Sequence, residues 1–145
     1  MIPLPRDFNE FLRLLNSSRA KYLLIGGYAV NFHGYSRSTG DLDIWIARDP
    51  ENAARVAAVL REFGFSGAQP DLLTAPNQIL RMGVPPLRLE ILTSISGVDF
   101  EECYGRRILA EIGGCEVSVI DLEDLKRNKR ASGRAKDLAD LDELA

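Results

Sequence analysis

Two aspartates separated by one residue are the first pattern in this 145-residue sequence that can carry chemistry. Asp41 and Asp43 alternate with apolar residues over 41–46, which predicts a strand that presents both carboxylates on one face. Carboxylates on one face repel each other, and a hard divalent cation offsets this repulsion, because Mg²⁺ is usually held by one or two carboxylates together with substrate phosphates. Glu90, in the strand-like segment 87–93, offers a third carboxylate, and three carboxylates can hold two metal ions.

A pair of glycines precedes the aspartates. Gly26-Gly27 follows the apolar segment 21–25, which predicts a buried strand that turns tightly into a helix over 28–33. Glycines at such a turn allow backbone N–H groups to approach a phosphate. The sequence contains neither a GxxxxGK[ST] loop nor a GxGxxG fingerprint. From these residues alone, the other interpretation, that the two aspartates only solvate an edge strand, stays open.

The remaining sequence predicts the elements that must position these residues. Helices are expected at 7–18, 28–33, 50–63, from Asp121 onward and again after Ser132-Gly133. Strands are expected at 21–25, 41–46, 78–84 and 87–93, with a turn-rich stretch at 70–76 and a hairpin of 106–112 with 116–120, the first arm of which could also be helical. This alternation predicts an α/β (α+β) fold: a mixed β-sheet with flanking helices and a helical C-terminus, in one domain spanning 1–145.

Composition narrows the classes of partner. Eighteen basic and 21 acidic residues give a net charge of −3, so no global positive field attracts nucleic acid, and any contact with RNA must be local. No signal peptide or membrane span is recognisable, which favours a cytoplasmic protein without a membrane partner. Cys103 and Cys115 form no CxxC pair, so we expect buried thiols rather than a disulfide or a zinc site.

The order of these motifs resembles the nucleotidyltransferases of the DNA polymerase beta superfamily, in their small bacterial branch. Thirteen residues separate the Gly26-Gly27 pair from Asp41-Leu42-Asp43-Ile44, and Glu90 lies between apolar residues, at a family position that is often Asp. Residues 37–43, RSTGDLD, are similar to the R-x-T-x-D-h-D run of the AbiEii toxin relatives, where h is apolar. Residues 129–140 resemble the K-x4-R-x-K-D-x2-D ending of the same relatives.

The resemblance implies the nucleotidyltransferase fold and the magnesium-dependent transfer of a nucleoside monophosphate from an NTP to an acceptor hydroxyl. It implies that Asp41, Asp43 and Glu90 are the catalytic residues and the ligands of two ions, Mg²⁺ or Mn²⁺. Asp137 and Asp140 are expected to hold neighbouring cations in place. Nucleotide or phosphate contacts are expected from Gly26, Gly27, Arg37, Thr39, Lys129, Arg134 and Lys136.

The acceptor and the biological role stay open. An RNA end such as that of a tRNA, a protein hydroxyl or a small molecule would each fit, and the AbiEii resemblance implies a toxin-antitoxin system with a cognate antitoxin. The alternative is a catalytically weak partner with the same fold, serving as an antitoxin or a nucleotide sensor. A third interpretation is a small α/β interaction domain whose carboxylates are only surface charge.

Two aromatic residues have open roles as well. Trp45 follows the aspartates on the same face of the predicted strand, where it could stack on a base or belong to the core. His33, the only histidine, ends the predicted helix over 28–33, which favours a structural role over catalysis.

Overall fold

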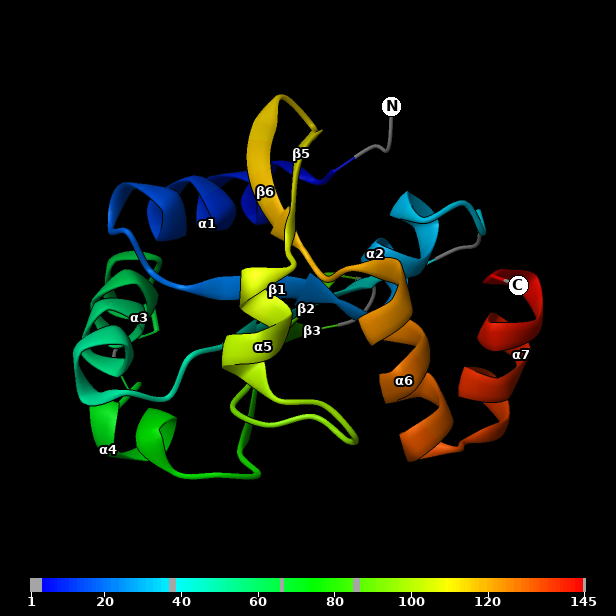
Figure 1. The fold of residues 1–145 in the computed structure, drawn as a ribbon. Helices are drawn as coiled ribbons and strands as arrows, with labels where there is room; N and C mark the ends of the chain where they lie inside the picture. Colours follow the sequence, from blue (N-terminus) through cyan, green and yellow to red (C-terminus); the bar gives the residue numbers. More distant parts are fainter. Residues whose placement is uncertain (1–3, 37–38, 66, 85–86, 145) are drawn as a thin grey trace.

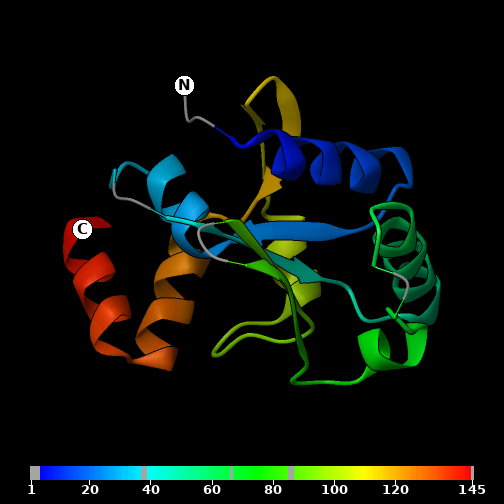
Figure 2. The same cartoon turned by 180° about the vertical axis from the view of Figure 1, so that it is seen from behind.

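The computed structural model describes residues 4–36, 39–65, 67–84 and 87–144. A six-stranded mixed sheet in the order β3-β4-β2-β1-β6-β5 forms its centre, with helices on both faces (Figures 1 and 2). The strands are β1 (Tyr22–Ile25), β2 (Asp41–Ile46), β3 (Ile79–Val84), β4 (Leu87–Leu92), β5 (Ile108–Ile112) and β6 (Cys115–Val119). The predicted fold class, a mixed sheet with flanking helices and a helical C-terminus, is confirmed.

The helices divide between the two faces of this sheet. They are α1 (Arg6–Ser17), α2 (Gly26–Phe32), α3 (Pro50–Glu62), α4 (Pro70–Thr74), α5 (Phe100–Gly105), α6 (Leu122–Ser132) and α7 (Ala135–Leu144). Helix α5 crosses in front of the strands in Figure 1, whereas α1 and α2 lie on the opposite face, which Figure 2 brings forward. The last two helices, α6 and α7, stand side by side at one end of the sheet.

Strand direction decides which residues meet across the sheet. The central strand β1 pairs antiparallel with β2 and parallel with β6. Strand β2 also pairs parallel with β4, so residues 41–45 align one by one with residues 88–92. The outer strands β3 and β5 run antiparallel to β4 and β6. The parallel β2–β4 pair is therefore the element that brings together two distant segments of the chain.

Helix α1 follows directly from the apolar spacing of its sequence. Phe8, Phe11, Leu12 and Leu15 recur at helical intervals, and all four side chains are buried. The Phe11 ring packs edge-to-face against Phe63, with 5.3 Å between the ring centroids. Burial of this stripe joins α1 to the core under the sheet.

One buried asparagine fixes the start of α3 against two strands. Asn52 accepts a hydrogen bond from the Lys21 N–H at 2.7 Å, and it donates to the carbonyls of Lys21 at 3.0 Å and Ala47 at 2.9 Å. Asp49 caps the same helix by accepting the Asn52 N–H at 3.0 Å, and Pro50 occupies the first helical position. These bonds hold the beginning of β1 and the end of β2 in a fixed relation.

Three local predictions differ from the structure. The turn-rich stretch at 70–76 contains the short helix α4, and α5, which the sequence did not indicate, spans only Phe100–Gly105. Such short helices show less than two turns of apolar periodicity, so the sequence pattern is weak. Helix α2 begins at Gly26 rather than at Tyr28. The open alternative at 106–112 is settled as the strand β5, which forms the predicted hairpin with β6.

Both cysteines are buried free thiols, as the sequence indicated. Within the described residues, none of the helices has the length and apolar character needed to cross a membrane.

Candidate active site

The sheet places Asp41, Asp43 and Glu90 on one face. Asp41 and Asp43 lie two residues apart on β2, so their side chains leave the strand on the same side. In the parallel β2–β4 pair, Asp43 stands opposite Glu90 and Asp41 stands opposite Arg88. Paired residues on neighbouring strands point to the same face, so the three carboxylates and one guanidinium form a single cluster. We call these four residues the carboxylate cluster.

The backbone at Gly26 makes room for one of these carboxylates. Gly26 follows β1 directly, with φ of +67°, a left-handed conformation that favours glycine. A Cβ atom on Gly26 would overlap Oδ2 of Asp43. The glycine is therefore required both by its backbone angle and by the closeness of Asp43. Gly27 lies buried in the first turn of α2, and phosphate contacts from either glycine remain a prediction.

Asp43 occupies an unfavourable position for a negative charge. Burial, followed by the neighbouring charges of Glu90 and Asp41, raises its pKa to about 7. The carboxyl groups of Asp43 and Glu90 lie within hydrogen-bond reach of each other. Oδ1 of Asp43 is enclosed and has no hydrogen-bond partner among the residues that the structure describes. We call this atom the open oxygen of Asp43. A buried acceptor of this kind is costly unless something else satisfies it.

Two arginines neutralise the other two carboxylates. Arg88 Nη2 lies 3.0 Å from Asp41 Oδ2, and Arg88 Nε lies 3.6 Å from Glu90 Oε1. Arg81, on the outer strand β3, places Nε 2.9 Å from the same Glu90 oxygen. Neither arginine was predicted from the sequence, although the alternation of Arg88 and Glu90 along a strand indicates that both share a face.

The carboxylate oxygens suit a hard divalent cation, although the side chains in this conformation do not converge on one point. Carboxylate oxygens are the ligands that Mg²⁺ prefers, and the open oxygen of Asp43 is a buried acceptor aligned with Glu90. In the described ranges of the chain, however, no three His, Cys, Asp or Glu side chains converge closely enough to hold a metal ion. Asp41 is turned instead toward Arg88. Metal binding by all three carboxylates therefore requires a change at Arg88.

The predicted phosphate-binding cations of the C-terminal helices divide into two kinds. Arg134 is 73% exposed and pairs with Asp137 at 2.7 Å, and Asp137, followed by Asp43 and Glu90, raises its pKa. Lys136 is exposed and lowers the pKa of Asp43 by its charge. Both cations therefore act electrostatically on the carboxylate cluster.

Lys129 has a different environment. Its ammonium is buried, 3.2 Å from Asp137 Oδ1 and 3.1 Å from Asp140 Oδ2. Ser132 donates a further hydrogen bond to Asp137 at 2.6 Å. Lys129 therefore joins α6 to α7. Asp137 and Asp140 hold this cation in place, as expected from the sequence, and both ion pairs of its ammonium are with these two carboxylates.

Residues just before the aspartates are placed only in part. The Thr39 hydroxyl donates to the Asp41 carbonyl across 3.4 Å, which braces the chain as it enters β2. Arg37, the other predicted phosphate contact of this loop, lies outside the described residues. A phosphate contact from Thr39 or Arg37 thus stays a prediction.

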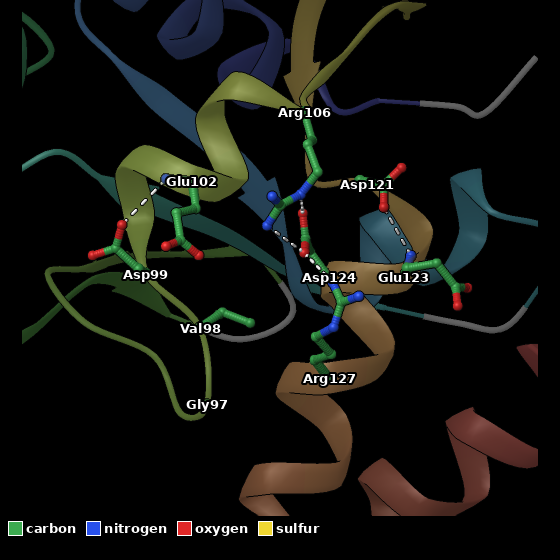
Figure 3. A pocket seen from close by; sticks show the side chains of 9 residues that line it. All are labelled: Gly97, Val98, Asp99, Glu102, Arg106, Asp121, Glu123, Asp124 and Arg127. Atoms are coloured by element: carbon green, nitrogen blue, oxygen red, sulfur yellow. Dashed lines mark hydrogen bonds and ion pairs between the residues drawn. The ribbon is translucent and has the colours of Figure 1, made fainter.

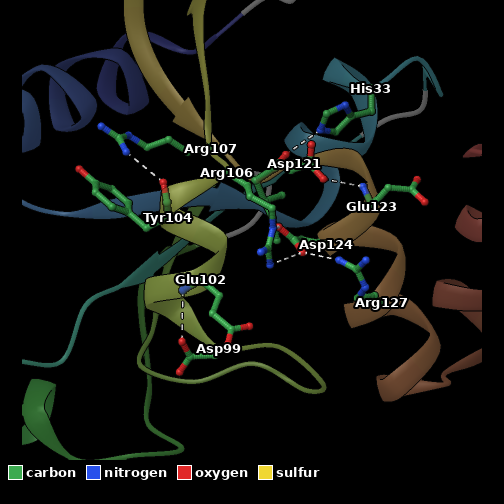
Figure 4. Close-up of polar contacts among 11 residues, drawn as sticks. His33, Asp99, Glu102, Tyr104, Arg106, Arg107, Asp121, Glu123, Asp124 and Arg127 are labelled. Atoms are coloured by element: carbon green, nitrogen blue, oxygen red, sulfur yellow. Dashed lines mark hydrogen bonds and ion pairs between the residues drawn. The ribbon is translucent and has the colours of Figure 1, made fainter.

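Trp45 and His33, whose roles the sequence left open, both make contacts that stabilise the fold. Trp45 is buried, and its ring packs edge-to-face against Phe100 of α5 at 5.1 Å, so it belongs to the core. His33 follows α2, and its Nε2 lies 2.7 Å from the Ile120 carbonyl oxygen at the end of β6 (Figure 4). This contact ties the helix that begins at Gly26 to the strand next to β1.

A second cluster of charged residues surrounds a cavity of about 720 Å³ between α5 and α6 (Figure 3). Asp124 is fully buried there, and Arg106 donates to its two oxygens at 3.0 Å each. Arg127 adds a third hydrogen bond at 2.7 Å, and Figure 4 shows both arginines converging on Asp124. Four further carboxylates line the cavity, namely Asp99, Glu102, Asp121 and Glu123. An acidic wall with both arginines engaged does not suit an anionic nucleotide.

Comparisons with known proteins bear on this geometry. No protein-family model and no curated protein sequence matches the chain. A Thermotoga maritima protein, provisionally assigned as a nucleotidyltransferase, is similar in structure with a TM-score of 0.61 and 14% identity, over 92% of this chain and 87% of its own. This chain has a nucleotidyltransferase-like fold. An antigenic nucleotidyltransferase-like protein from Paracoccidioides brasiliensis is also similar, with a TM-score of 0.56 and 18% identity, over 94% of this chain and 72% of its own.

Proposed function

We propose that this protein is a metal-dependent nucleotidyltransferase that transfers a nucleoside monophosphate from an NTP to an acceptor hydroxyl. The observation that carries the proposal is the open oxygen of Asp43, a buried acceptor on the residue that pairs with Glu90, in a fold shared with nucleotidyltransferase-like proteins. A carboxylate needed only for stability would be expected to have its oxygens satisfied. Asp43 instead has a raised pKa and spare coordination capacity, which are properties of functional sites.

In this proposal the three carboxylates have distinct roles. Asp41 and Asp43 would hold both ions, Mg²⁺ or Mn²⁺, and Glu90 would complete the site of the second ion. When bound, two such ions neutralise and align the attacking and leaving oxygens of an in-line displacement. Gly26 supports this arrangement, because its lack of a side chain keeps the Asp43 carboxylate in place.

The proposed reaction balances without a covalent enzyme intermediate. The acceptor oxygen forms a bond to the α-phosphorus of the NTP, and the bond from this phosphorus to the bridging oxygen breaks, which releases pyrophosphate. Glu90 would accept the proton of the acceptor hydroxyl and pass it to solvent. Positioning and charge neutralisation supply most of the catalysis in such transfers, so a nucleophilic side chain is not required.

The exposed cations beside the cluster would bind the triphosphate. Arg134 is mostly exposed and acts electrostatically on Asp43 and Glu90, and Lys136 acts on Asp43. Arginine offers bidentate contacts to phosphate oxygens, and lysine offers a mobile point charge. Thr39 and Arg37 are assigned to the same triphosphate, at the start of β2. Lys129 is assigned to the α6–α7 contact instead.

The acceptor, the partner and the biological role are proposed from the resemblance to known relatives. On the resemblance to the AbiEii toxin relatives, we assign the protein to a toxin-antitoxin system, with an RNA end such as that of a tRNA as acceptor ahead of a protein or a small molecule. The net charge of −3 requires that an RNA acceptor be bound through local contacts near Arg134 and Lys136. A cytoplasmic location, where NTPs are abundant, remains a prediction.

One observation favours a second candidate, a catalytically weak partner that retains the fold as an antitoxin or a nucleotide sensor. Arg88 and Arg81 already neutralise Asp41 and Glu90. If these ion pairs persisted in the presence of metal and nucleotide, the carboxylates could not bind two ions. This candidate predicts nucleotide binding that is weak and independent of metal.

Calorimetric titration with each NTP, in Mg²⁺ or in EDTA, tests the proposal and separates the two candidates. The wild type is compared with the Asp41→Ala/Asp43→Ala variant and with Asp142→Ala/Glu143→Ala, a matched control that removes two exposed carboxylates from α7. Binding that requires both metal and the β2 aspartates supports the enzyme and justifies a search for the acceptor with labelled NTP. Binding in EDTA that survives the first variant supports the nucleotide sensor. No binding of any NTP contradicts the enzyme and favours the partner that retains the fold as an antitoxin.

A further inference from the structure

Arg88 differs from Arg106, the arginine that holds the buried Asp124 with two hydrogen bonds. Arg106 donates to both oxygens of Asp124 at 3.0 Å, the bidentate geometry that arginine and carboxylate favour. Arg88 makes one hydrogen bond of this quality, from Nη2 to Asp41 at 3.0 Å. Its Nε is buried and 3.6 Å from Glu90, beyond hydrogen-bond distance, and finds no other partner within the described part of the chain. Arg88 is therefore an incompletely satisfied cation.

The backbone nonetheless fixes Arg88 in the middle of the carboxylate cluster. Its N–H donates to the Gly40 carbonyl at 3.2 Å, and its position on β4 is aligned with Asp41 of β2. Glu90 lies two residues further along the same strand and thus on the same face. The Arg88 guanidinium therefore occupies the space between two carboxylates that the proposed function assigns to metal.

A guanidinium and a divalent cation cannot share this space. The Asp41 oxygen that accepts from Arg88 would have to turn toward a metal ion at a distance of about 2.1 Å, and a guanidinium left in place would add its repulsion to that between the two ions. Release of Arg88 is not costly, because its partner Asp41 is about one third exposed and such pairs contribute little stability. Once released, a guanidinium at this place is suited to bind phosphate oxygens in a bidentate manner.

From this geometry we propose that Arg88 is an exchangeable counter-ion, which neutralises Asp41 and Glu90 in the metal-free protein and moves to the phosphates of the NTP when metal and nucleotide enter. The inference rests on the proposed function and assigns Arg88 as a nucleotide-binding residue of the same site. It explains why the three carboxylates do not converge while Asp41 pairs with Arg88. Arg81 contributes less, since it is 59% exposed and its ion pair is with Glu90 rather than with Asp41.

The inference predicts opposite effects of one substitution on two ligands. In Arg88→Gln, the affinity for Mn²⁺ alone should rise by roughly 5-fold, because the competing cation is removed. The affinity for ATP in saturating Mn²⁺ should fall by roughly 10-fold, because a phosphate ligand is lost. Free Mn²⁺ is measured by electron paramagnetic resonance, and ATP binding is measured by calorimetry. If Arg88 were needed only for folding, the substitution would lower the affinity for both Mn²⁺ and ATP.

Three further variants sharpen the test. Arg88→Lys keeps the charge and should leave the Mn²⁺ affinity within about 2-fold of the wild type. This variant can be measured even if Arg88→Gln does not fold. Arg81→Gln should change the Mn²⁺ affinity by about 2-fold or less, since this side chain is mostly exposed. Arg55→Gln is the matched control for net charge, because Arg55 pairs with Glu51 on the surface of α3, and it should change neither affinity.

The outcomes separate this inference from the proposed function. If the wild type binds Mn²⁺ through Asp43 but Arg88→Gln binds it no more tightly, or binds Mn²⁺–ATP equally well, the counter-ion inference is overturned and the metal site stands. If neither protein binds Mn²⁺, the proposed metal site and the inference both fail. Binding by Arg88→Gln but not by the wild type supports the inference in its strongest form.

Discussion

A fully buried aspartate and a partly buried aspartate of this protein have opposite surroundings. Asp124, at the start of α6, is fully buried and receives three hydrogen bonds from Arg106 and Arg127. Burial alone would raise its pKa, but these arginines outweigh burial and lower it. Asp43, on β2, has the open oxygen and a pKa raised to about 7 by burial, by Glu90 and by Asp41. One carboxylate is stabilised as an anion, and the other is not.

The difference teaches how to separate structural from functional carboxylates in a single chain. Asp137 resembles Asp124, because Lys129, Ser132 and Arg134 satisfy both of its oxygens, and its pKa is lowered although burial opposes this. Such saturated carboxylates join elements to one another. A carboxylate that the fold buries without satisfying is available to a ligand, and its unfavourable energy is recovered only when the ligand binds.

The largest effect is expected from Asp43→Asn. Loss of the carboxylate should weaken metal-dependent NTP binding by at least about 1,000-fold, or about 4 kcal/mol, because the proposed ligand of both ions is removed. Circular dichroism should show an intact fold. Asp142→Asn, an exposed change of the same kind on α7, is the control and should bind as the wild type does. Equal NTP affinities in the two variants would contradict the assignment of Asp43.

Asp124→Asn tests the other side of the comparison. It should lower the free energy of unfolding by about 3 kcal/mol, because two arginines lose a buried counter-charge, while their partial exposure limits the cost. Urea unfolding measures this loss against Asp142→Asn, for which a change below about 0.5 kcal/mol is expected. NTP binding by folded Asp124→Asn should be unchanged. A stability equal to that of the control would show that Asp124 is not the structural carboxylate described above.

Gly26→Ala should have an intermediate effect. The left-handed φ and the overlap with Asp43 should cost about 2 kcal/mol of unfolding free energy and displace the Asp43 carboxylate, which also weakens Mn²⁺ binding. Gly67→Ala is the control, because no atom lies within 4 Å of the added Cβ and the backbone angle is ordinary. The loss of stability caused by Gly26→Ala should be smaller in the Asp43→Ala background than in the wild type. Strict additivity would mean that the two residues do not crowd each other.

The smallest effect, in stability as a function of pH, should have opposite signs for the two aspartates. Because the folded-state pKa of Asp43 is raised above its usual value near 4, its protonation stabilises the metal-free fold at low pH, and this stability is lost as pH rises from about 4 to 7. Thermal melts of Asp43→Asn should therefore show a gain over the wild type that grows to about 1 kcal/mol at pH 8.

For Asp124 the pKa is lowered, so its contribution is present above about pH 4 and is lost as pH falls below this value. The deficit of Asp124→Asn relative to the wild type should accordingly shrink toward pH 3. Saturating Mg²⁺ should reverse the sign for Asp43→Asn, since only the wild type gains stability by binding the ion. Parallel pH profiles for the two variants would refute the comparison.

The sequence predicts those parts of the molecule in which spacing alone determines the environment. The alternation over 41–46 is sufficient for the strand and for the shared face of Asp41 and Asp43, and the apolar stripe of α1 is sufficient for its helix. The strand-like pattern over 87–93 offers Glu90 and the resemblance supports it, and the parallel β2–β4 register places it opposite Asp43. These predictions rely on local periodicity or on a motif.

The features that the sequence did not indicate depend on contacts between distant segments. Arg88 meets Asp41 across 47 positions, and Arg106 meets Asp124 across 18, so neither pair has a local pattern. Lys129 has the spacing of a phosphate-binding residue, but the fold buries its ammonium between two carboxylates of α7. Burial and pairing are properties of the tertiary structure, and they decide which charged residues are free to act.

Gly26 and Asp43 also constrain each other's evolution. While the Asp43 carboxylate is present, any side chain at position 26 collides with it. A descendant that lost this carboxylate would lose the collision and keep only the left-handed backbone angle, which asparagine tolerates better than most other residues do. Substitutions at position 26 should therefore follow the loss of Asp43 and should not precede it. Among relatives of this protein, a glycine at this place would then mark lineages in which the carboxylate is still in use.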